Sequence, residues 1–160
     1  MINDLYEQEH EDFRAGVIAF LERECVPHHE KWEADGIVDR DVWRKAGEQG
    51  LLGLQLDEEY GGGGTPDFRY NVVIGEEMTR RGVYGPAFTL FNDMIVPYLV
   101  SSANDEQKAR WFPRLASGEL IAAIVSPAHR PGNQRSRCSS VALAARYGTI
   151  MSLNSVNAAP

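Results

Sequence analysis

Four consecutive glycines, Gly61–Gly64, are the first feature of the sequence that could do chemistry. The backbone N–H groups of a glycine-rich loop that leads into a helix can hold a phosphate. Thr65, with Pro66 behind it, is a favourable pair for the start of such a helix. However, neither a Gly-Lys-Ser/Thr sequence nor the strand and spacing of a dinucleotide-binding loop accompanies the run. The spacing therefore favours a structural loop, and a phosphate cradle is the alternative.

The histidines and cysteines are the candidate metal ligands. His28 and His29 lie close to Cys25 and two glutamates, but Pro27 interrupts the helical spacing and neighbouring histidines point apart. A solvated polar turn is the preferred interpretation, and we expect no metal site. The two cysteines, Cys25 and Cys138, are too few for a disulfide framework and favour reduced thiols in a cytoplasmic protein.

The remaining polar residues give no catalytic signature. The sequence has no Gly-x-Ser-x-Gly elbow, no Cys/His pair and no paired-carboxylate pattern, and His10 has no partner at a useful spacing. Glu76 and Glu77 fall in the middle of an expected helix, where a solvated helix face is favoured over a buried functional acid. The residue types and their spacing alone therefore identify only a helical domain, without a catalytic function.

Apolar spacing predicts the elements that must position these residues. The expected helices span 5–26, 28–34, 40–49, 66–81, 86–101 and 105–117, with 51–56 as a short buried connection. Short loops between such helices are typical of a bundle. The fold class is therefore all-α, with a helical domain over 1–118, a first strand at 119–125 and an irregular, disordered tail over 126–160. Within this tail, residues 141–145 are long enough for one turn of helix.

Charge divides the chain at nearly the same place. The net charge is −7, but all 23 Asp and Glu and 12 of the 16 Lys and Arg fall in residues 1–119, whereas 120–160 has four arginines and no acid. The acidic balance argues against nucleic-acid binding, and the sparse arginines of the tail are not interleaved with aromatic residues as in a single-strand binder. The N-terminus has no signal-peptide pattern, and no apolar run is long enough for a membrane span.

The segment 111–124 closely resembles the acyl-CoA dehydrogenase family. It reads WFPRLASGELIAAI, and in that family a W-L/F-P-x-L-A-S-G-E segment joins an N-terminal helical domain to a middle β domain. Further motifs follow in the family's order: LLGL at 51–54, EEYGG at 58–62 with Asp57 at the usual proline, GEEM at 75–78, GPAFTLFND at 85–93 and NDEQK at 104–108. The resemblance covers about residues 4–124, and the run at 85–93 is most like the long-chain-type branch.

This resemblance implies a flavoprotein of fatty acid β-oxidation. Members of the family bind FAD and remove two hydrogens from the α and β carbons of an acyl-CoA thioester. A carboxylate takes the α proton and the flavin N5 takes the β hydride. The N-terminal helical domain supplies a wall of the acyl pocket. We expect the helix with Phe88, Phe91, Asn92 and Ile95 to face the acyl chain, with core packing as the alternative for the phenylalanines.

The resemblance ends where the family's flavin motif begins. There the family reads approximately A-M-T/S-E-P-G-x-G-S-D, whereas residues 125–133 read VSPAHRPGN. Ser126 is the one candidate for the Thr/Ser position that holds the flavin. In most of the family the catalytic base lies in a C-terminal helical domain that is absent from these 160 residues, so no catalytic residue is assigned.

A shift of reading frame near residue 125 is a hypothesis that explains this departure. Read one base later, the codons allowed for residues 129–137 permit Thr, Gly/Asp/Ala, Pro, Gly, Thr, Ser/Asn, Asp and Leu. That order is nearly the family's T-E-P-G-x-G-S-D-L. The acid-free composition of the tail agrees with an out-of-frame segment.

The resemblance implies FAD as cofactor and acyl-CoA as substrate. We expect the 160-residue chain, taken alone, to be inactive, to lose FAD and to expose an apolar face that drives homo-oligomer formation. The alternative is a non-enzymatic helical binding or assembly module derived from the same family. Related flavoproteins such as acyl-CoA oxidase or nitroalkane oxidase share the N-terminal pattern.

Overall fold

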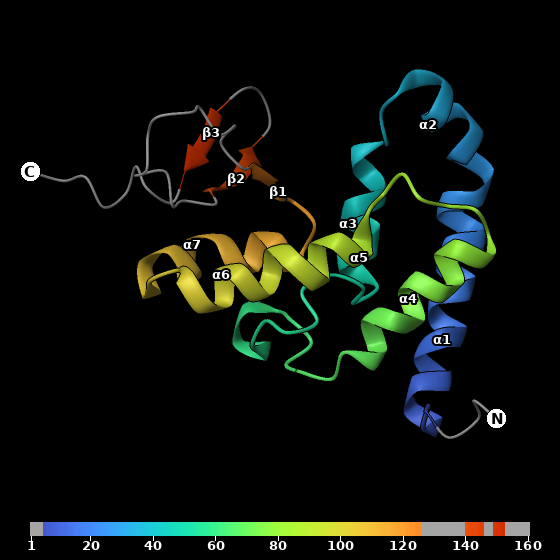
Figure 1. Cartoon of the computed structure of the whole chain (residues 1–160), viewed down its shortest axis with the longest axis horizontal. Helices are drawn as coiled ribbons and strands as arrows, with labels where there is room; N and C mark the ends of the chain where they lie inside the picture. The colour runs from blue at the N-terminus through green and yellow to red at the C-terminus, as the bar shows by residue number, and fades with distance from the viewer. Residues whose placement is uncertain (1–4, 126–139, 146–148, 153–160) are drawn as a thin grey trace, which may run out of the picture.

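The computed structural model describes residues 5–125, together with the backbone of 140–145 and 149–152. Its helical part begins with a long N-terminal helix and continues through two short helices to a glycine-rich loop (Figure 1). These elements are α1 (Gln8–Phe20), a π-helical segment η1 (Leu21–Cys25), a 3-10 turn η2 (Val26–His28), α2 (His29–Asp35), α3 (Arg40–Glu48) and a 3-10 turn η3 (Glu58–Tyr60).

The second half of the helical part contains α4 (Arg69–Arg80), α5 (Phe88–Leu90), a π-helical segment η4 (Phe91–Ile95), α6 (Val96–Ser102) and α7 (Asp105–Ala116). It begins with α4 beside α1 and continues through α6 and α7, which lie away from α1 (Figure 1). Helix α4 packs against α1, and α5 packs against α4. Within the part of the chain that the structure describes, no helix is long and apolar enough to cross a membrane.

The apolar stripes expected from the sequence form one core. In α1 the buried Val17 and Phe20 face the rest of the domain, as their spacing predicts. The connection over 51–56 is buried through four leucines, which confirms its predicted role. Helix α7 begins at Asp105, as expected, and Asn104 caps it. The Asn104 side chain accepts a hydrogen bond from the backbone N–H of Gln107 at 2.9 Å in a capping box.

The start of α4 differs from the prediction. The sequence favours a helix that is capped by Thr65, but α4 begins at Arg69. The hydroxyl of Thr65 accepts from the backbone N–H of Asp67 at 3.2 Å, and the Asp67 carboxylate accepts from the N–H of Arg69 at 2.9 Å. These two local turns use the side chains that would otherwise cap a longer helix, so the chain enters α4 three residues late.

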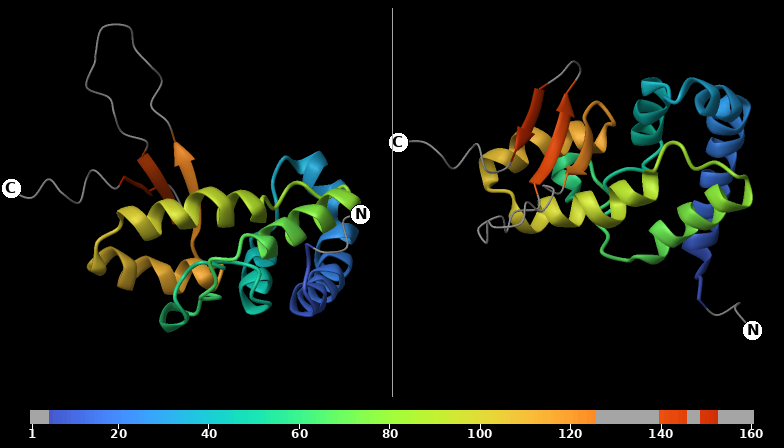
Figure 2. Two further views of the ribbon diagram at one scale, coloured as in Figure 1. Left: turned by 60° about the horizontal axis from the view of Figure 1, so that its bottom comes forward. Right: turned by 45° about the horizontal axis from the view of Figure 1, so that its top comes forward.

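Three strands form an antiparallel sheet in the order β1-β2-β3. They are β1 (Ile121–Val125), β2 (Ser140–Ala145) and β3 (Thr149–Ser152), and they lie over α6 and α7, far from α1 (Figure 2). Strand β1 and the mainly helical fold confirm the predicted fold class. The expectation of a helical turn at 141–145 was wrong, because this segment pairs with β1. Such long-range pairing overrides local propensity and leaves no sign in a short sequence window.

Candidate functional site

The helix expected to face the acyl chain runs without interruption from Phe88 to Ser102 through α5, η4 and α6. Ala87 begins it with a positive φ of 50°, a conformation that no other non-glycine residue in the described part of the chain adopts. The middle of the helix, Phe91–Ile95, is π-helical. Short π-helical segments inside helices are frequent at functional sites, because they rotate the side chains that follow.

One side of this helix is core. Phe88, Phe91 and Ile95 are almost completely buried. The indole ring of Trp43 on α3 packs edge-on against both phenylalanines, with ring centroids 5.2 Å from Phe88 and 5.8 Å from Phe91. This geometry is the favourable one for aromatic pairs. Phe88 and Phe91 therefore hold the helix against α3, and Ile95 is buried on the same side of the helix.

Asn92, the fourth predicted residue, fastens the helix to the buried connection. Its side-chain oxygen accepts from the N–H of Gly53 at 2.9 Å, and its amide nitrogen donates to the carbonyl of Leu51 at 2.8 Å. Both functional groups of the amide are thus used, and the side chain is buried. The structure brings the four predicted residues together on the inner face of the helix. Their contact with an acyl chain stays a prediction, and Ser126 lies outside the described residues.

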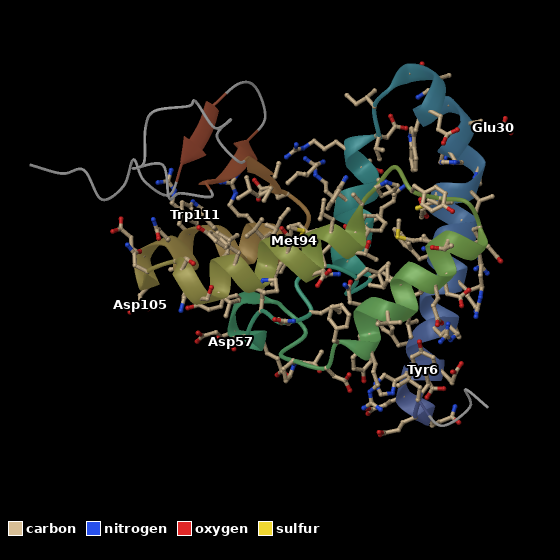
Figure 3. The ribbon with its side chains drawn as sticks, in the orientation of Figure 1. Tyr6, Glu30, Asp57, Met94, Asp105 and Trp111 are labelled. Carbon is tan, nitrogen blue, oxygen red and sulfur yellow. The ribbon has the colours of Figure 1, made fainter. Side chains whose placement is uncertain are left out.

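The outer side of the same helix carries apolar residues that the sequence analysis did not select. Leu90 and Met94, one helical turn apart, are each about half exposed, at 49% and 48%. Figure 3 shows Met94 on the open face of the helix, toward the side on which the strands lie. Strand β1 packs against η4. The structure therefore presents two apolar side chains to solvent beside the point where the helical domain passes into the sheet.

Replacing Asn92 with Ala is expected to lower the free energy of unfolding by about 2–4 kcal/mol, because the N–H of Gly53 and the carbonyl of Leu51 would stay buried without partners. Urea unfolding followed by circular dichroism measures this change. Thr89→Ala on the same helix is the matched control, since no residue that the structure describes hydrogen-bonds to the Thr89 hydroxyl, and it should change stability by less than about 0.5 kcal/mol. Equal losses in both variants would contradict the role of Asn92.

The glycine run is a structural loop, which confirms the favoured interpretation. The N–H groups of Gly61, Gly63 and Gly64 donate to the carbonyls of Glu58, Gly53 and Leu56 at 2.9, 3.1 and 2.8 Å, and Gly62 donates to Asp57 at 3.3 Å. A Cβ atom on Gly62 would lie 2.2 Å from the carbonyl oxygen of Leu56. The glycines are therefore required for close packing, and their amides are not free to hold a phosphate.

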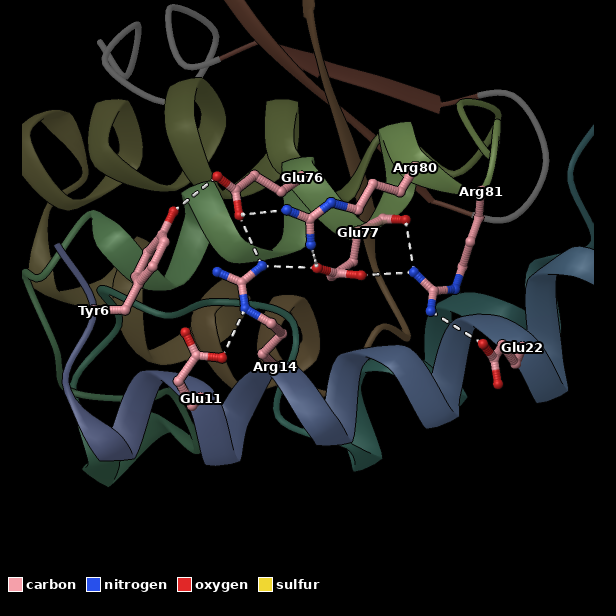
Figure 4. A network of polar contacts seen from close by, with 8 residues as sticks. All are labelled: Tyr6, Glu11, Arg14, Glu22, Glu76, Glu77, Arg80 and Arg81. Atoms are coloured by element: carbon pink, nitrogen blue, oxygen red, sulfur yellow. Dashed lines mark hydrogen bonds and ion pairs between the residues drawn. The ribbon is translucent and has the colours of Figure 1, made fainter. Parts of the chain in front are cut away.

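The carboxylates of α4 lie in a network of charges between α4 and α1 (Figure 4). Glu77 is almost fully buried and accepts from Arg14 at 2.7 Å, from Arg81 at 2.6 Å and from Arg80. Glu76 accepts from Arg14 at 2.7 Å and from the hydroxyl of Tyr6 at 3.0 Å. The expectation of a solvated helix face was therefore wrong for Glu77. Its partners saturate both carboxylate oxygens, so the arrangement is structural.

His10 is a second buried polar residue for which sequence reasoning found no partner. Its Nδ1 accepts from the backbone N–H of Glu7 at 3.1 Å, which leaves Nε2 to donate to the Asp67 carboxylate at 3.3 Å. Arg69 also donates to Asp67, and its hydrogen bonds hold the pKa of that carboxyl far below its ordinary value. These contacts tie the first turn of α1 to the entry of α4. They join residues that are far apart in the sequence.

The candidate metal ligands do not converge. Among the described residues, no group of histidine, cysteine and acidic side chains has the arrangement of a metal site. Burial raises the pKa of the Cys25 thiol to about 12, so this cysteine stays protonated and unreactive at neutral pH. His28 ends the 3-10 turn η2 and His29 begins helix α2.

Together these features define a class of protein: a helical domain whose last helix leads directly into an antiparallel sheet. Residues 7–119 match the family described as "Acyl-CoA dehydrogenase, N-terminal domain". The chain therefore belongs to the acyl-CoA dehydrogenase family, and the resemblance seen in the sequence is confirmed.

Individual relatives agree with this assignment. The chain is 39% identical to the mouse long-chain specific acyl-CoA dehydrogenase over 123 residues, which cover 77% of this chain and 28% of the mouse protein. It is 31% identical to a potato isovaleryl-CoA dehydrogenase, with 75% and 30% of the two chains covered. The chain thus spans about three tenths of the length of these relatives.

Solved structures show the same fold. The crystal structure of an acyl-CoA dehydrogenase from Geobacillus kaustophilus superposes with a TM-score of 0.69 at 43% identity and covers 74% of this chain and 31% of its own. A glutaryl-CoA dehydrogenase from Mycobacterium smegmatis, solved in complex with FADH2, gives a TM-score of 0.63 at 26% identity and covers 74% and 31%.

Proposed function

We propose that the protein serves FAD-dependent α,β-dehydrogenation of acyl-CoA thioesters, and that its helical domain supplies an apolar wall for the acyl chain. The observation that carries this proposal is the half-exposed pair Leu90 and Met94 beside β1, on a helix whose other side is fully packed. Each methylene of an acyl chain that leaves water against such a surface contributes about 0.8 kcal/mol. The family of the chain supports the choice of ligand.

The buried residues on the same helix take a supporting role in this proposal. Phe88 and Phe91 fix the helix against α3, Ile95 is buried beside them, and Asn92 fixes the helix to the connection at Leu51. Because all four are packed, they set the position and direction of Leu90 and Met94. The acyl chain itself would meet the outer pair, with the inner residues behind it.

The described residues do not themselves form a flavin site. The amides of the glycine loop, which are the natural donors for a phosphate group, all donate to backbone carbonyls. The family's flavin motif would fall at residues 126–133, where the sequence departs from it. FAD thus belongs to the proposal through the family, and we expect the purified 160-residue chain to retain none. We also propose a cytoplasmic location. For the 160-residue chain taken alone we propose association into homo-oligomers, because its apolar side chains Leu90 and Met94 are then uncovered.

A chimera tests the proposed function. Residues 5–120 would replace the corresponding helical domain of the Geobacillus kaustophilus acyl-CoA dehydrogenase, to which the chain is 43% identical. We expect the chimera to bind FAD and to show bleaching of the flavin absorbance when a long-chain acyl-CoA is added. Leu90→Asp in this chimera should lower kcat/KM for long acyl chains about tenfold, because a charge would replace apolar contact surface.

The control in the chimera is Ile37→Asp, which changes an equally apolar and more exposed residue between α2 and α3, 69% exposed. This variant should keep its kcat/KM. A chimera that binds FAD but shows no bleaching with any acyl-CoA would contradict the proposal. That outcome would favour the alternative, a non-enzymatic helical binding or assembly module.

A further inference from the structure

The sulfur-containing side chains of the helical domain differ sharply in their exposure to solvent. Cys25 in η1 is fully buried, and Met78 on α4 is only 4% exposed. Met94 in η4 is 48% exposed and lies on the open face of its helix (Figure 3). Among the residues whose side chains the structure describes, Met94 is therefore the one sulfur-containing residue that is open to a reagent in solution.

The position of Met94 gives this exposure a consequence. Leu90, one helical turn away, is also about half exposed, and strand β1 packs against the same segment η4. Methionine is among the residues most often buried in folded proteins, so its exposure here is unusual. Leucine or isoleucine would provide a similar apolar surface. What methionine adds to the surface of Leu90 and Met94 is a thioether sulfur, which can be oxidised.

Oxidation of a thioether by hydrogen peroxide is a two-electron step. The sulfur lone pair attacks one oxygen of the peroxide, so that an S–O bond forms and the O–O bond breaks. The second oxygen leaves as water, with the proton that the transferred oxygen gives up. The sulfur is thereby oxidised and the peroxide is reduced. The product, methionine sulfoxide, is polar, and sulfoxide reductases convert it back to the thioether.

We propose that Met94 is a reversible oxidation site, at which a peroxide makes part of the apolar wall of Leu90 and Met94 polar. The gain from apolar contact is proportional to the apolar area that leaves water, so an acyl chain gains less against the sulfoxide than against the thioether. This inference rests on the proposed acyl wall and adds a regulation of it. Peroxide weakens the use of long acyl chains, and reduction of the sulfoxide restores it.

Peptide mapping by mass spectrometry tests the site of oxidation in the full chain. The protein is treated with millimolar hydrogen peroxide at low protein concentration, where self-association covers the wall least, and initial rates are measured. We expect the sulfoxide to form at least about tenfold faster at Met94 than at Met78, because burial hinders access of the oxidant. Met78 is thus a matched control within the same molecule. Equal rates at the two methionines would overturn the proposal.

The chimera with the Geobacillus kaustophilus enzyme tests the consequence of oxidation. Each protein is compared with its own untreated form, so the effect of a substitution by itself does not enter. Peroxide should lower kcat/KM for a long-chain acyl-CoA about tenfold in the chimera that carries Met94. Met94→Leu, which is apolar but has no sulfur at this place, should show no such loss. The two methionine sulfoxide reductases, supplied with a thiol reductant, should restore the lost kcat/KM.

The results for the chimera separate this inference from the proposed function. Suppose that the untreated chimera is active but keeps its kcat/KM when Met94 is fully oxidised, or that Met94→Leu loses as much as the parent chimera. Either result overturns the oxidation site and leaves the acyl wall in place. A chimera that binds FAD but shows no bleaching before treatment contradicts the proposed function, and the inference fails with it.

Discussion

Glu77→Gln is expected to lower the free energy of unfolding by about 3–5 kcal/mol, as is found when one partner of a buried ion pair is removed. The side chain of Glu77 is 2% exposed and faces three guanidinium groups, those of Arg14, Arg80 and Arg81. Glutamine keeps the shape of the side chain but removes the charge, and its amide nitrogen would point a donor at another donor. Urea unfolding of the two proteins measures the difference.

Glu76→Gln is the matched control for this change. It lies next to Glu77 on α4 and also pairs with Arg14, but its side chain is 34% exposed. Water can solvate the freed guanidinium there, so we expect a loss of about 1 kcal/mol. Similar losses in the two variants would show that burial of Glu77 does not determine its contribution.

The native protein and Glu77→Gln should also differ in how their stability responds to acid. Burial by itself raises the pKa of Glu77, but the hydrogen bonds from Arg14 and Arg81 outweigh it and hold the pKa below its ordinary value of 4.5. A carboxylate with a lowered pKa stabilises the fold fully above the ordinary pKa, and this contribution is lost as the pH falls through the lower, folded value. The native protein should therefore lose stability below about pH 4.5 more steeply than Glu77→Gln does. Parallel curves would contradict this assignment.

The network shows why part of the site escapes sequence reasoning. Arg14 and Glu77 are 63 positions apart, and no local spacing connects them. A pair of adjacent glutamates on a helix suggests one solvated face, yet α1 crosses α4 at this level and buries one of the two. By contrast, the helices themselves follow from apolar spacing and local capping, as with Asn104 and Gln107 at the start of α7.

Sequence reasoning is also incomplete for the helix that carries the proposed acyl wall. Its strong apolar stripe, Phe88, Phe91 and Ile95, is easy to find in the sequence because the core selects it. Leu90 and Met94 have the same chemistry but face outward, and a sequence does not distinguish apolar residues that face a core from those that face a ligand. The structure makes this distinction through exposure.

Gly118 lies where the chain passes from the helical domain into the sheet, in close contact with α3. Gly118 has a φ of +69°, and a Cβ atom there would lie 1.9 Å from the carbonyl oxygen of Trp43. Gly118→Ala should therefore lower the free energy of unfolding by more than about 4 kcal/mol, since backbone strain and a clash with α3 add. Circular dichroism during urea unfolding reports both a smaller stability and, at the extreme, loss of the fold.

Two other glycines separate the causes. Gly50 has a similar φ of +74° with no atom within 4 Å of an added Cβ, so Gly50→Ala isolates backbone strain, about 1 kcal/mol. Gly47, inside α3, has no such φ, but its Cβ would lie 2.4 Å from the backbone carbon of Ser117, so Gly47→Ala isolates the clash. We expect the loss in free energy of unfolding to be smallest for Gly50→Ala, larger for Gly47→Ala and largest for Gly118→Ala.

The order of these losses bears on function, because the contact between α3 and Ser117–Gly118 fixes where the chain leaves the helical domain. Arg40 at the start of α3 adds a hydrogen bond to the carbonyl of Glu119. Strand β1 begins two residues later and packs against η4, beside Leu90 and Met94. The backbone at Ser117–Gly118 can lie this close to α3 because Gly47 and Gly118 have no side chains. This close contact thus determines the position of the sheet relative to the proposed acyl wall. If Gly118→Ala were no more damaging than Gly50→Ala, this contact would not be close in solution, and the sheet would not be held in place by it.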